Sequence, residues 1–527
     1  MKGGRMVVFR SPHPDVEIPT NLSLPDFLFQ RAAPRRDKVA FVDGETGATL
    51  TFGEVIEDSR RVAAGYAALG LQRGEVVALY SPNNLDWPIA YYGALLAGAV
   101  VTTVNPLHTS DELRRQLDDT NAAMILTTSD LIERVDQIRS ATNLRDVITF
   151  DGVQGTVSFK DLLDHGPAPH IELDPASVCL LPSSSGTTGR PKAVMLTHEN
   201  IVANIIQCEG GDFWTEKDVL INVLPFYHLA GLGIFLNLGF AAGSTMVLLP
   251  RFDLELMLAG IEKHRVNKTF LVPPILLAMA KDPRVDRYDL SSLTSVICSA
   301  APVGRELSEL FSNRLDCELR EGFGMTETSP GISVNPSGRI VHGSAGPLMP
   351  GTEGKIVNTQ TGEDLGAHEL GEIWIRGPQV MKGYLNRPDA TAITITPDGW
   401  LRTGDIGYVD EDGYFYIVDR LKELIKYKAY QVAPAELEDV LKGHPDILDA
   451  AVVGSPDAEA GELPKAFIVA DGNLSQREVI DYVAARVAPY KKIRLVEFID
   501  AIPKNPSGKI LRRELIERER APAASTA

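Results

Sequence analysis

The sequence predicts an α/β protein with a large N-terminal domain of helix-covered parallel sheets plus a small β-barrel, followed by a small C-terminal α+β domain. Three observations predict this organisation. The chain has 527 residues, well beyond the roughly 250–300 residues at which a single core stops growing. Buried β-branched runs alternate with helical segments before Gly343. Short strands with glycine-rich turns begin at Gly343, and a compact α+β pattern begins beyond Arg420.

The N-terminal part alternates strand-like and helix-like segments. Apolar spacing near 3.6 residues predicts helices, and apolar β-branched runs predict buried strands. The helices are expected at residues 88–99, 110–120 and 303–315, and the strands at residues 76–81, 99–106, 122–128, 146–151 and 219–225. Such alternation is typical of parallel sheets that helices cover.

The rest of the chain has shorter elements. From Gly343 to Val418, short strands and glycine-rich turns indicate a small barrel or antiparallel unit. Beyond Arg420, about a hundred residues of α+β pattern are enough for a small domain. Helices are expected at 433–444 and 475–487, and strands at 449–454, 465–470 and 494–499. We therefore expect domains at residues 1–420 and 421–527.

Composition limits the partners and the location. The net charge is 52 − 70 = −18, which disfavours a nucleic-acid partner. The four cysteines show no CxxC pairing, so neither a disulfide framework nor a zinc site is indicated. No apolar segment suits a signal peptide, and the apolar residues 229–243 are too few to span a membrane and read better as a buried helix. We expect a cytoplasmic protein without an integral membrane segment, either a monomer or a homodimer.

A loop rich in hydroxyl groups and glycine follows the apolar run 178–182. Its sequence, SSSGTTGRPK, would let the backbone approach an anion closely, while Arg190 and Lys192 add positive charge. It is not a Walker A loop, because no GxxxxGK[ST] string occurs. Alone, it could equally be a plain surface loop. The candidate phosphate-binding residues are Ser183, Ser184, Ser185, Gly186, Thr187, Thr188, Gly189 and Lys192.

Longer strings resemble the acyl-adenylate-forming superfamily, which includes acyl-CoA synthetases, peptide-synthetase adenylation domains and beetle luciferases. SSSGTTGRPKAVMLTH resembles its signature loop, and EGFGMTE, WLRTGD, VDRLKELIKYKAYQVAPAELE and NPSGKILRR follow in the family's order. LPFYHLAG, SSLTSVICSAAP and GPQVMKGYLNRP are most similar to 4-coumarate–CoA ligase-like acyl-CoA synthetases. The resemblance implies an acid–thiol ligase that uses ATP, Mg²⁺ and coenzyme A. A small-molecule carboxylic acid would become an acyl-AMP, and its acyl group would then pass to the CoA thiol.

The resemblance also implies residue roles. Phe323 would stack on adenine, Thr326 would bond phosphate, and Glu327 would hold Mg²⁺ through a hard oxygen ligand. The other implied nucleotide-binding residues are Ala300, Ala301, Pro302, Glu321, Gly322, Asp405 and Arg420.

Two lysines would serve the two half-reactions in turn. Lys509 would act in adenylation, and a rotation of the mobile small domain about Lys422 would bring Lys426 and Gln431 to the same site. His228 would lie by the acyl carboxylate, although a lone histidine beside apolar residues is more often structural.

The chain departs from the family's pattern in the implied CoA tunnel and acyl pocket, among other positions. The implied CoA tunnel consists of Lys428, Ala429 and Tyr430, and Ala429 replaces a common glycine, so its methyl group could narrow the tunnel. Ala230 falls where plant hydroxycinnamate enzymes carry tyrosine, and Ile234 replaces a small polar residue. The implied acyl pocket consists of His228, Ala230, Ile234, Ala301, Gly324 and Pro330. An apolar tail is expected; an aryl (hydroxycinnamate-like) acid and a medium-chain acid both remain open.

Other functions fit the sequence less well. An acyl-AMP ligase that loads a carrier protein and a luciferase-like oxygenase share these strings and remain alternatives. Amino-acid adenylation is disfavoured because no aspartate follows Phe226 to pair an α-ammonium group. A serine hydrolase is disfavoured because no GxSxG elbow occurs. Intact Glu327, Asp405 and Lys509 argue against a non-catalytic nucleotide-binding protein.

Overall fold

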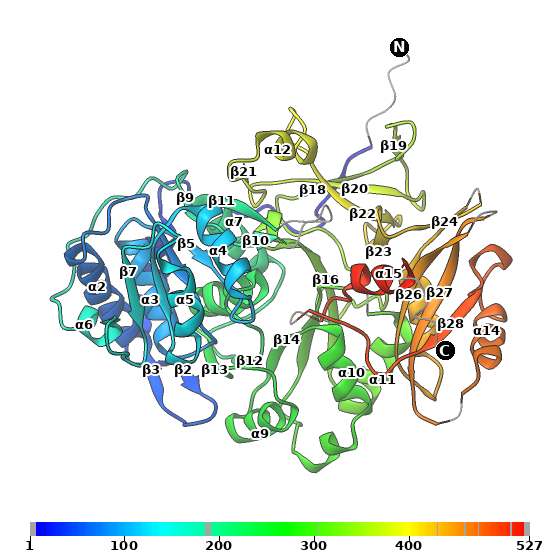
Figure 1. The fold of residues 1–527 in the computed structure, drawn as a ribbon, viewed down its shortest axis with the longest axis horizontal. Coiled ribbons are helices and arrows are strands. Elements are labelled where there is room, and N and C mark those ends of the chain that lie inside the picture. Colours follow the sequence, from blue (N-terminus) through cyan, green and yellow to red (C-terminus); the bar gives the residue numbers. More distant parts are fainter. Residues whose placement is uncertain are drawn as a thin grey trace.

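Four β-sheets organise the described part of the chain in this computed structural model (Figure 1). The structure describes residues 7–184, 191–301, 303–428, 430–457, 460–472, 474–505 and 508–520, with the backbone alone at residues 430, 431 and 520. Two large sheets are mainly parallel, a third is antiparallel, and the fourth belongs to the chain beyond Arg420. The predicted α/β fold class is confirmed.

Helices cover both faces of the first large sheet. Val76 and Ala78 face a core that contains residues of α4 and α5, whereas Val77 and Leu79 face the core that contains residues of α2 and α3. The helices are α2 (Phe52–Ala68), α3 (Asp86–Leu96), α4 (Ser110–Thr120), α5 (Ile132–Arg139) and α6 (Phe159–Leu163). The strand order is β10-β11-β9-β5-β4-β6-β7-β8, with β21 also on β11. Its strands are β4 (Val76–Leu79), β5 (Val100–Thr103), β6 (Ala122–Thr127), β7 (Asp146–Thr149), β8 (Val157–Ser158), β9 (Val178–Leu180), β10 (Ser183–Ser184), β11 (Lys192–Thr197) and β21 (Gly383–Tyr384).

The second large sheet carries six neighbouring parallel strands. Its order is β17-β16-β15-β14-β12-β13-β2-β3. The strands are β2 (Val39–Asp43), β3 (Thr49–Thr51), β12 (Val219–Asn222), β13 (Thr245–Leu248), β14 (Lys268–Leu271), β15 (Ser295–Cys298), β16 (Glu318–Gly324) and β17 (Gly331–Val334). The helices of this part of the chain are α1 (Leu24–Ala32), α7 (His198–Gly210), α8 (Gly239–Ala242), α9 (Leu254–His264), α10 (Pro273–Lys281) and α11 (Arg305–Leu315).

The antiparallel sheet stands in the region where the sequence indicates a barrel. Its order is β1-β18-β20-β22-β23, with β19 on β18. The strands are β1 (Phe9–Arg10), β18 (Glu353–Val357), β19 (Asp364–Leu365), β20 (Gly371–Arg376), β22 (Leu401–Val409) and β23 (Phe415–Arg420), and helix α12 (Pro388–Thr394) lies between β21 and β22 in the chain.

The chain beyond Arg420 builds its own core around a mixed sheet. Ile425, Leu437 and Val452 belong to a buried cluster composed entirely of residues from this part of the chain. The strands are β24 (Ile425–Tyr427), β25 (Tyr430–Val432), β26 (Ile447–Asp457), β27 (Gly461–Ala470) and β28 (Leu495–Phe498). The helices are α13 (Pro434–Lys442), α14 (Gln476–Ala484) and α15 (Arg512–Arg520).

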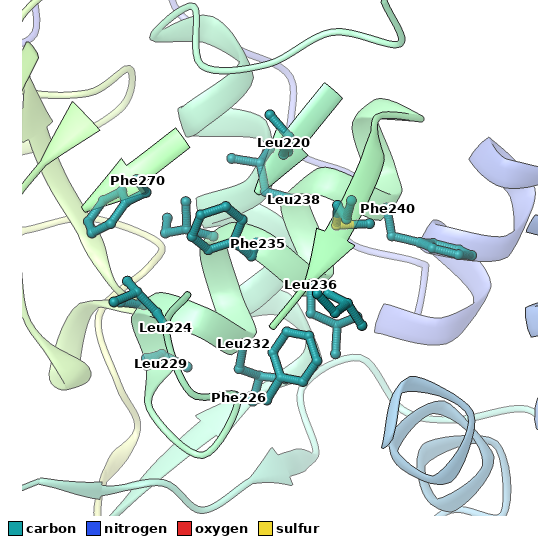
Figure 2. Packing of buried hydrophobic residues seen from close by; sticks show 14 of the residues in the cluster. Leu220, Leu224, Phe226, Leu229, Leu232, Phe235, Leu236, Leu238, Phe240 and Phe270 are labelled. Atoms are coloured by element: carbon teal, nitrogen blue, oxygen red, sulfur yellow. The ribbon is translucent and has the colours of Figure 1, made fainter. Parts of the chain in front are cut away.

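The apolar stretch 229–243 forms a buried π-helix, η3 (Ala230–Leu238), that continues into α8. Figure 2 shows Leu229, Leu232, Phe235 and Leu238 of this stretch within the apolar cluster. Among the described residues, no helix combines the length and apolar character that crossing a bilayer requires. The predicted strand 219–225 ends early at Asn222, whose side chain accepts a hydrogen bond from the Leu224 N–H at 3.0 Å and turns the chain.

Candidate active site

A cavity of about 740 Å³ opens beyond the carboxyl ends of β12, β14, β15 and β16. Ligands of open α/β sheets bind at this edge because loops from neighbouring strands converge there. Residues from both sides of Arg420 line the cavity. The predicted site residues among its lining are Ser183, Ser184, Lys192, His228, Ala230, Ile234, Ala300, Gly322, Phe323, Gly324, Thr326, Glu327, Pro330, Arg420, Lys422 and Lys509.

Several predicted residues do not line this cavity or cannot be placed. Ala301, Glu321, Asp405, Lys426 and Lys428 are absent from the described lining. Ser185, Gly186, Thr187, Thr188, Gly189, Pro302 and Ala429 lie outside the described residues, as do the side chains of Tyr430 and Gln431.

The Glu327 carboxylate is held by a tyrosine that the sequence analysis did not single out. Tyr384 donates a hydrogen bond from its phenol to Glu327 Oε1 at 2.8 Å, and Lys192 Nζ lies 4.5 Å from the centre of the Tyr384 ring. The pairing of β11 with β21 brings these residues together. The 377–388 string resembles the family's pattern, but it carries no local sign of this contact.

The Glu327 carboxylate suits a metal ion whose remaining ligands would include phosphate oxygens of the substrate. Among the described residues, no cluster of three or more acidic, histidine or cysteine side chains could hold a metal alone. Mg²⁺ is commonly held by one or two carboxylates together with substrate phosphates. Thr326 stands beside Glu327 at the cavity. A single buried carboxylate facing a phosphate-binding cavity therefore suits Mg²⁺.

Asp405, which is buried, and Arg420, which is partly exposed, form an ion pair at the edge of the cavity. Strands β22 and β23 place the two residues opposite one another, and Arg420 Nε lies 3.2 Å from Asp405 Oδ1. Burial raises the pKa of Asp405 to about 6, while Arg420 opposes this shift. The pair can present a carboxylate acceptor and a guanidinium donor to one ligand.

Glu321 points away from the cavity. Its Oε1 accepts hydrogen bonds from the Ser308 hydroxyl at 2.9 Å and the Gly343 N–H at 2.8 Å. Burial raises its pKa to about 7. Alternation along β16 explains the orientation, because the next residue, Gly322, lines the cavity.

His228 is positioned as a neutral hydrogen-bond donor. Its Nδ1 accepts the Ala230 N–H at 3.2 Å, so in the neutral ring the proton is on Nε2. Burial lowers its pKa to about 4. Asn83 holds the preceding loop by accepting the Phe226 N–H at 2.8 Å and donating to the Leu224 carbonyl at 2.9 Å.

The structure presents Lys509, and not Lys426, to the cavity. Burial and the Arg420 guanidinium lower the pKa of the Lys509 ammonium group. The backbone N–H of Lys509 donates a hydrogen bond to Asn505 Oδ1 at 2.8 Å. Lys426 is exposed, and its N–H donates to Glu462 Oε2 at 2.7 Å. The segment that carries Lys509 is also anchored by Arg512, which pairs with Glu423 at 2.8 Å and with Glu438.

A further part of the cavity lining did not emerge from the sequence. Thr103, Asn105, His108 and Gln116 follow or flank the carboxyl end of β5. The available signal was that Thr103 and Asn105 lie near the end of the predicted strand 99–106, with His108 just beyond it; Gln116, in helix α4, had no such signal.

Comparisons with known proteins place this site in a family. A family model described as AMP-binding enzyme matches residues 28–385, and one described as AMP-binding enzyme C-terminal domain matches residues 436–509. The 4-coumarate–CoA ligase 5 of Oryza sativa subsp. japonica is 44% identical over 96% of each chain. The 4-coumarate–CoA ligase of Pinus taeda is 42% identical over 97% of each chain.

Solved structures agree with this relationship. ATP-bound MatB from Rhodopseudomonas palustris has a TM-score of 0.87 and 28% identity, covering 95% of this chain and 99% of that chain. The anthranilate CoA ligase AuaEII in complex with anthranoyl-AMP has a TM-score of 0.89 and 25% identity, covering 95% of this chain and 98% of that chain. The predicted resemblance is thus confirmed, and the chain belongs to the AMP-binding enzyme family.

Proposed function

We propose that the chain is an AMP-forming acid–thiol ligase that converts a carboxylic acid, ATP and CoA into an acyl-CoA, AMP and pyrophosphate. The observation that carries the proposal is one cavity that combines an apolar pocket, the phosphate-loop residue Lys192, the Asp405–Arg420 pair at its edge and Lys509. Near full-length similarity to 4-coumarate–CoA ligases supports an aryl acid of the cinnamate type.

The first half-reaction needs positioning and positive charge. The carboxylate oxygen attacks the α-phosphorus of ATP, the acyl-AMP bond forms, and the bond to pyrophosphate breaks. Lys192 and Lys509 stabilise the charge that gathers on the phosphates, and His228 Nε2–H orients the attacking carboxylate. Bound Mg²⁺ would neutralise phosphate charge; Glu327 is the residue that would hold it, and Tyr384 positions the Glu327 carboxylate.

The second half-reaction uses a different arrangement of the chain. The thiol sulfur of CoA attacks the acyl carbon, AMP leaves with the bonding electrons, and the thiol proton passes to solvent. We assign residues 1–420 and 421–527 to two domains that hinge at Lys422, which would replace Lys509 by the segment of Lys426 and Gln431. The separate core beyond Arg420 supports this division, as does the exposure of Lys426.

Pyrophosphate release across a panel of acids, with and without CoA, tests the proposal when followed by mass spectrometry of the product. We expect release near one equivalent without CoA, and many turnovers with acyl-CoA and AMP as products when CoA is present. Acyl-AMP that persists with CoA would instead favour a carrier-protein loader, and oxygen-dependent light would favour an oxygenase. Four buried free cysteines support a location in the cytoplasm, where thiols stay reduced. We further propose that the protein is a monomer or a homodimer.

A further inference from the structure

We propose that the acyl pocket selects acids whose distal end is apolar and discriminates against a para-hydroxyl group there, with Ile234 and Phe213 as the specificity-determining residues. This inference rests on the proposed function and concerns which acid the ligase takes. The inference differs from the substrate that the names of the relatives give, 4-coumarate, which carries a phenolic hydroxyl group.

The distal wall of the pocket is built from apolar side chains on neighbouring elements. Phe270 of β14 and Ile297 of β15 are register partners, so they lie side by side on one face of the sheet. Both line the cavity, together with Phe213. Lys268, two residues before Phe270, donates to the Phe213 carbonyl at 3.3 Å. Phe213 is thereby placed at the end of the same pocket wall.

A buried arginine holds this wall and occupies the polar backbone groups behind it. The guanidinium of Arg320 lies 5.8 Å from the centre of the Phe213 ring. It donates to the carbonyls of Gly211 at 2.7 Å, Asp212 at 2.6 Å and Asn335 at 2.7 Å. A buried cation requires such partners. These three residues are also absent from the described lining of the cavity, so their carbonyls are not offered to a substrate hydroxyl there.

Another part of the pocket wall comes from the π-helix η3. Ala230 and Ile234 of this helix both line the cavity. Gly233 allows the helix to approach Pro330, because a Cβ at this position would lie 2.9 Å from Pro330 Cδ. π-Helical turns commonly occur at functional sites. The close approach makes Ile234, a fully apolar side chain, part of the pocket surface.

The hydroxyl group of Ser333 is part of the described lining but is directed elsewhere. The Ser333 hydroxyl donates to the Ala345 carbonyl at 2.8 Å. Ser299 lies two residues beyond Ile297, past the end of β15 and beside Ala300, so it lies toward the mouth. A phenol placed against Phe213, Phe270 and Ile297 would give up hydrogen bonds to water, because these side chains offer none in return. Such a loss corresponds to roughly 5–100-fold in kcat/KM.

The test compares cinnamate, 4-coumarate and octanoate as substrates for pyrophosphate release by the full-length enzyme. We expect kcat/KM for cinnamate or octanoate to exceed that for 4-coumarate at least fivefold. The faster of the two apolar acids shows whether the preferred tail is aryl or alkyl. If 4-coumarate equals or exceeds both, the inference is wrong while the ligase function stands. Failure of every acid would contradict the proposed function itself.

A matched pair of variants tests the role of Ile234. Valine and threonine have nearly the same shape, and they differ by a methyl group against a hydroxyl. We expect the ratio of kcat/KM for 4-coumarate over cinnamate to be at least threefold higher in Ile234→Thr than in Ile234→Val. Equal ratios would overturn the assignment of Ile234. Phe213→Leu, which shortens the distal wall, should raise the relative rate with decanoate over octanoate; an unchanged ratio would overturn the assignment of Phe213.

Discussion

Replacing Lys509 by alanine should stop adenylate formation while sparing thioester formation. The ammonium group is half-buried at the cavity, where a charge about 4 Å from a developing charge contributes about 4 kcal/mol at an effective dielectric constant of 20. Each 1.36 kcal/mol is tenfold in rate. The loss should therefore be about 10²–10³-fold, as for other preorganised donors.

Separate assays of the two half-reactions check this expectation. Pyrophosphate release from ATP and acid reports adenylation, and acyl-CoA formation from supplied acyl-AMP reports transfer. Lys426→Ala should show the reverse pattern, because Lys426 is exposed and outside the cavity in the arrangement described. Lys217→Ala, a change of an exposed lysine elsewhere, should leave both rates unchanged. Equal losses of both half-reactions in each of the two site variants would refute the two-arrangement account.

Three further changes have defined outcomes. Tyr384→Phe removes the hydrogen bond to Glu327 and should raise the Mg²⁺ concentration for half-maximal pyrophosphate release about 10–100-fold; an unaltered Mg²⁺ titration would contradict this. The pKa of Glu321 is raised to about 7, so its contribution to stability is present below its unfolded pKa and is lost as pH rises through 7. Glu321→Gln should therefore gain about 1–3 kcal/mol in free energy of unfolding relative to wild type between pH 5 and 8, measured by urea denaturation at each pH; parallel stability curves would exclude this effect. Asn83→Ala leaves the buried backbone of residues 224–226 without its partners and should lower the free energy of unfolding by about 2–4 kcal/mol, with a corresponding fall in the urea midpoint.

Short contiguous motifs predict loop residues of the site well, because neighbouring residues in such a motif reach the same cavity. The residues from Gly322 to Glu327 are contiguous, and all six line one cavity. Strand alternation explains why Glu321 does not, since it faces Ser308 and Gly343. That orientation was available from the period of two along a strand, but the resemblance alone assigned Glu321 to the nucleotide.

Contacts between distant segments could not be predicted from the sequence. Tyr384 meets Glu327 across 57 positions, and Asn83 meets Phe226 across 143. These partners depend on strand pairing and loop packing, which leave no periodic trace in either segment. Hydropathy predicted a buried helix at 229–243, but it does not distinguish α from π winding.

The distribution of positive charge explains how an acidic chain can expel pyrophosphate. The net charge is −18, yet Lys192, Arg420, Lys422 and Lys509 line one cavity. Lys192 comes from β11 of a large sheet and Arg420 from β23 of the antiparallel sheet, whereas Lys422 and Lys509 follow Arg420 in sequence. Under the proposed hinge motion, the full positive field would exist only while the part of the chain beyond Arg420 is docked as described. The first step, which must hold a polyphosphate, requires that field. Once pyrophosphate has left, only one phosphate remains, and withdrawing Lys509 removes a charge that AMP release no longer needs.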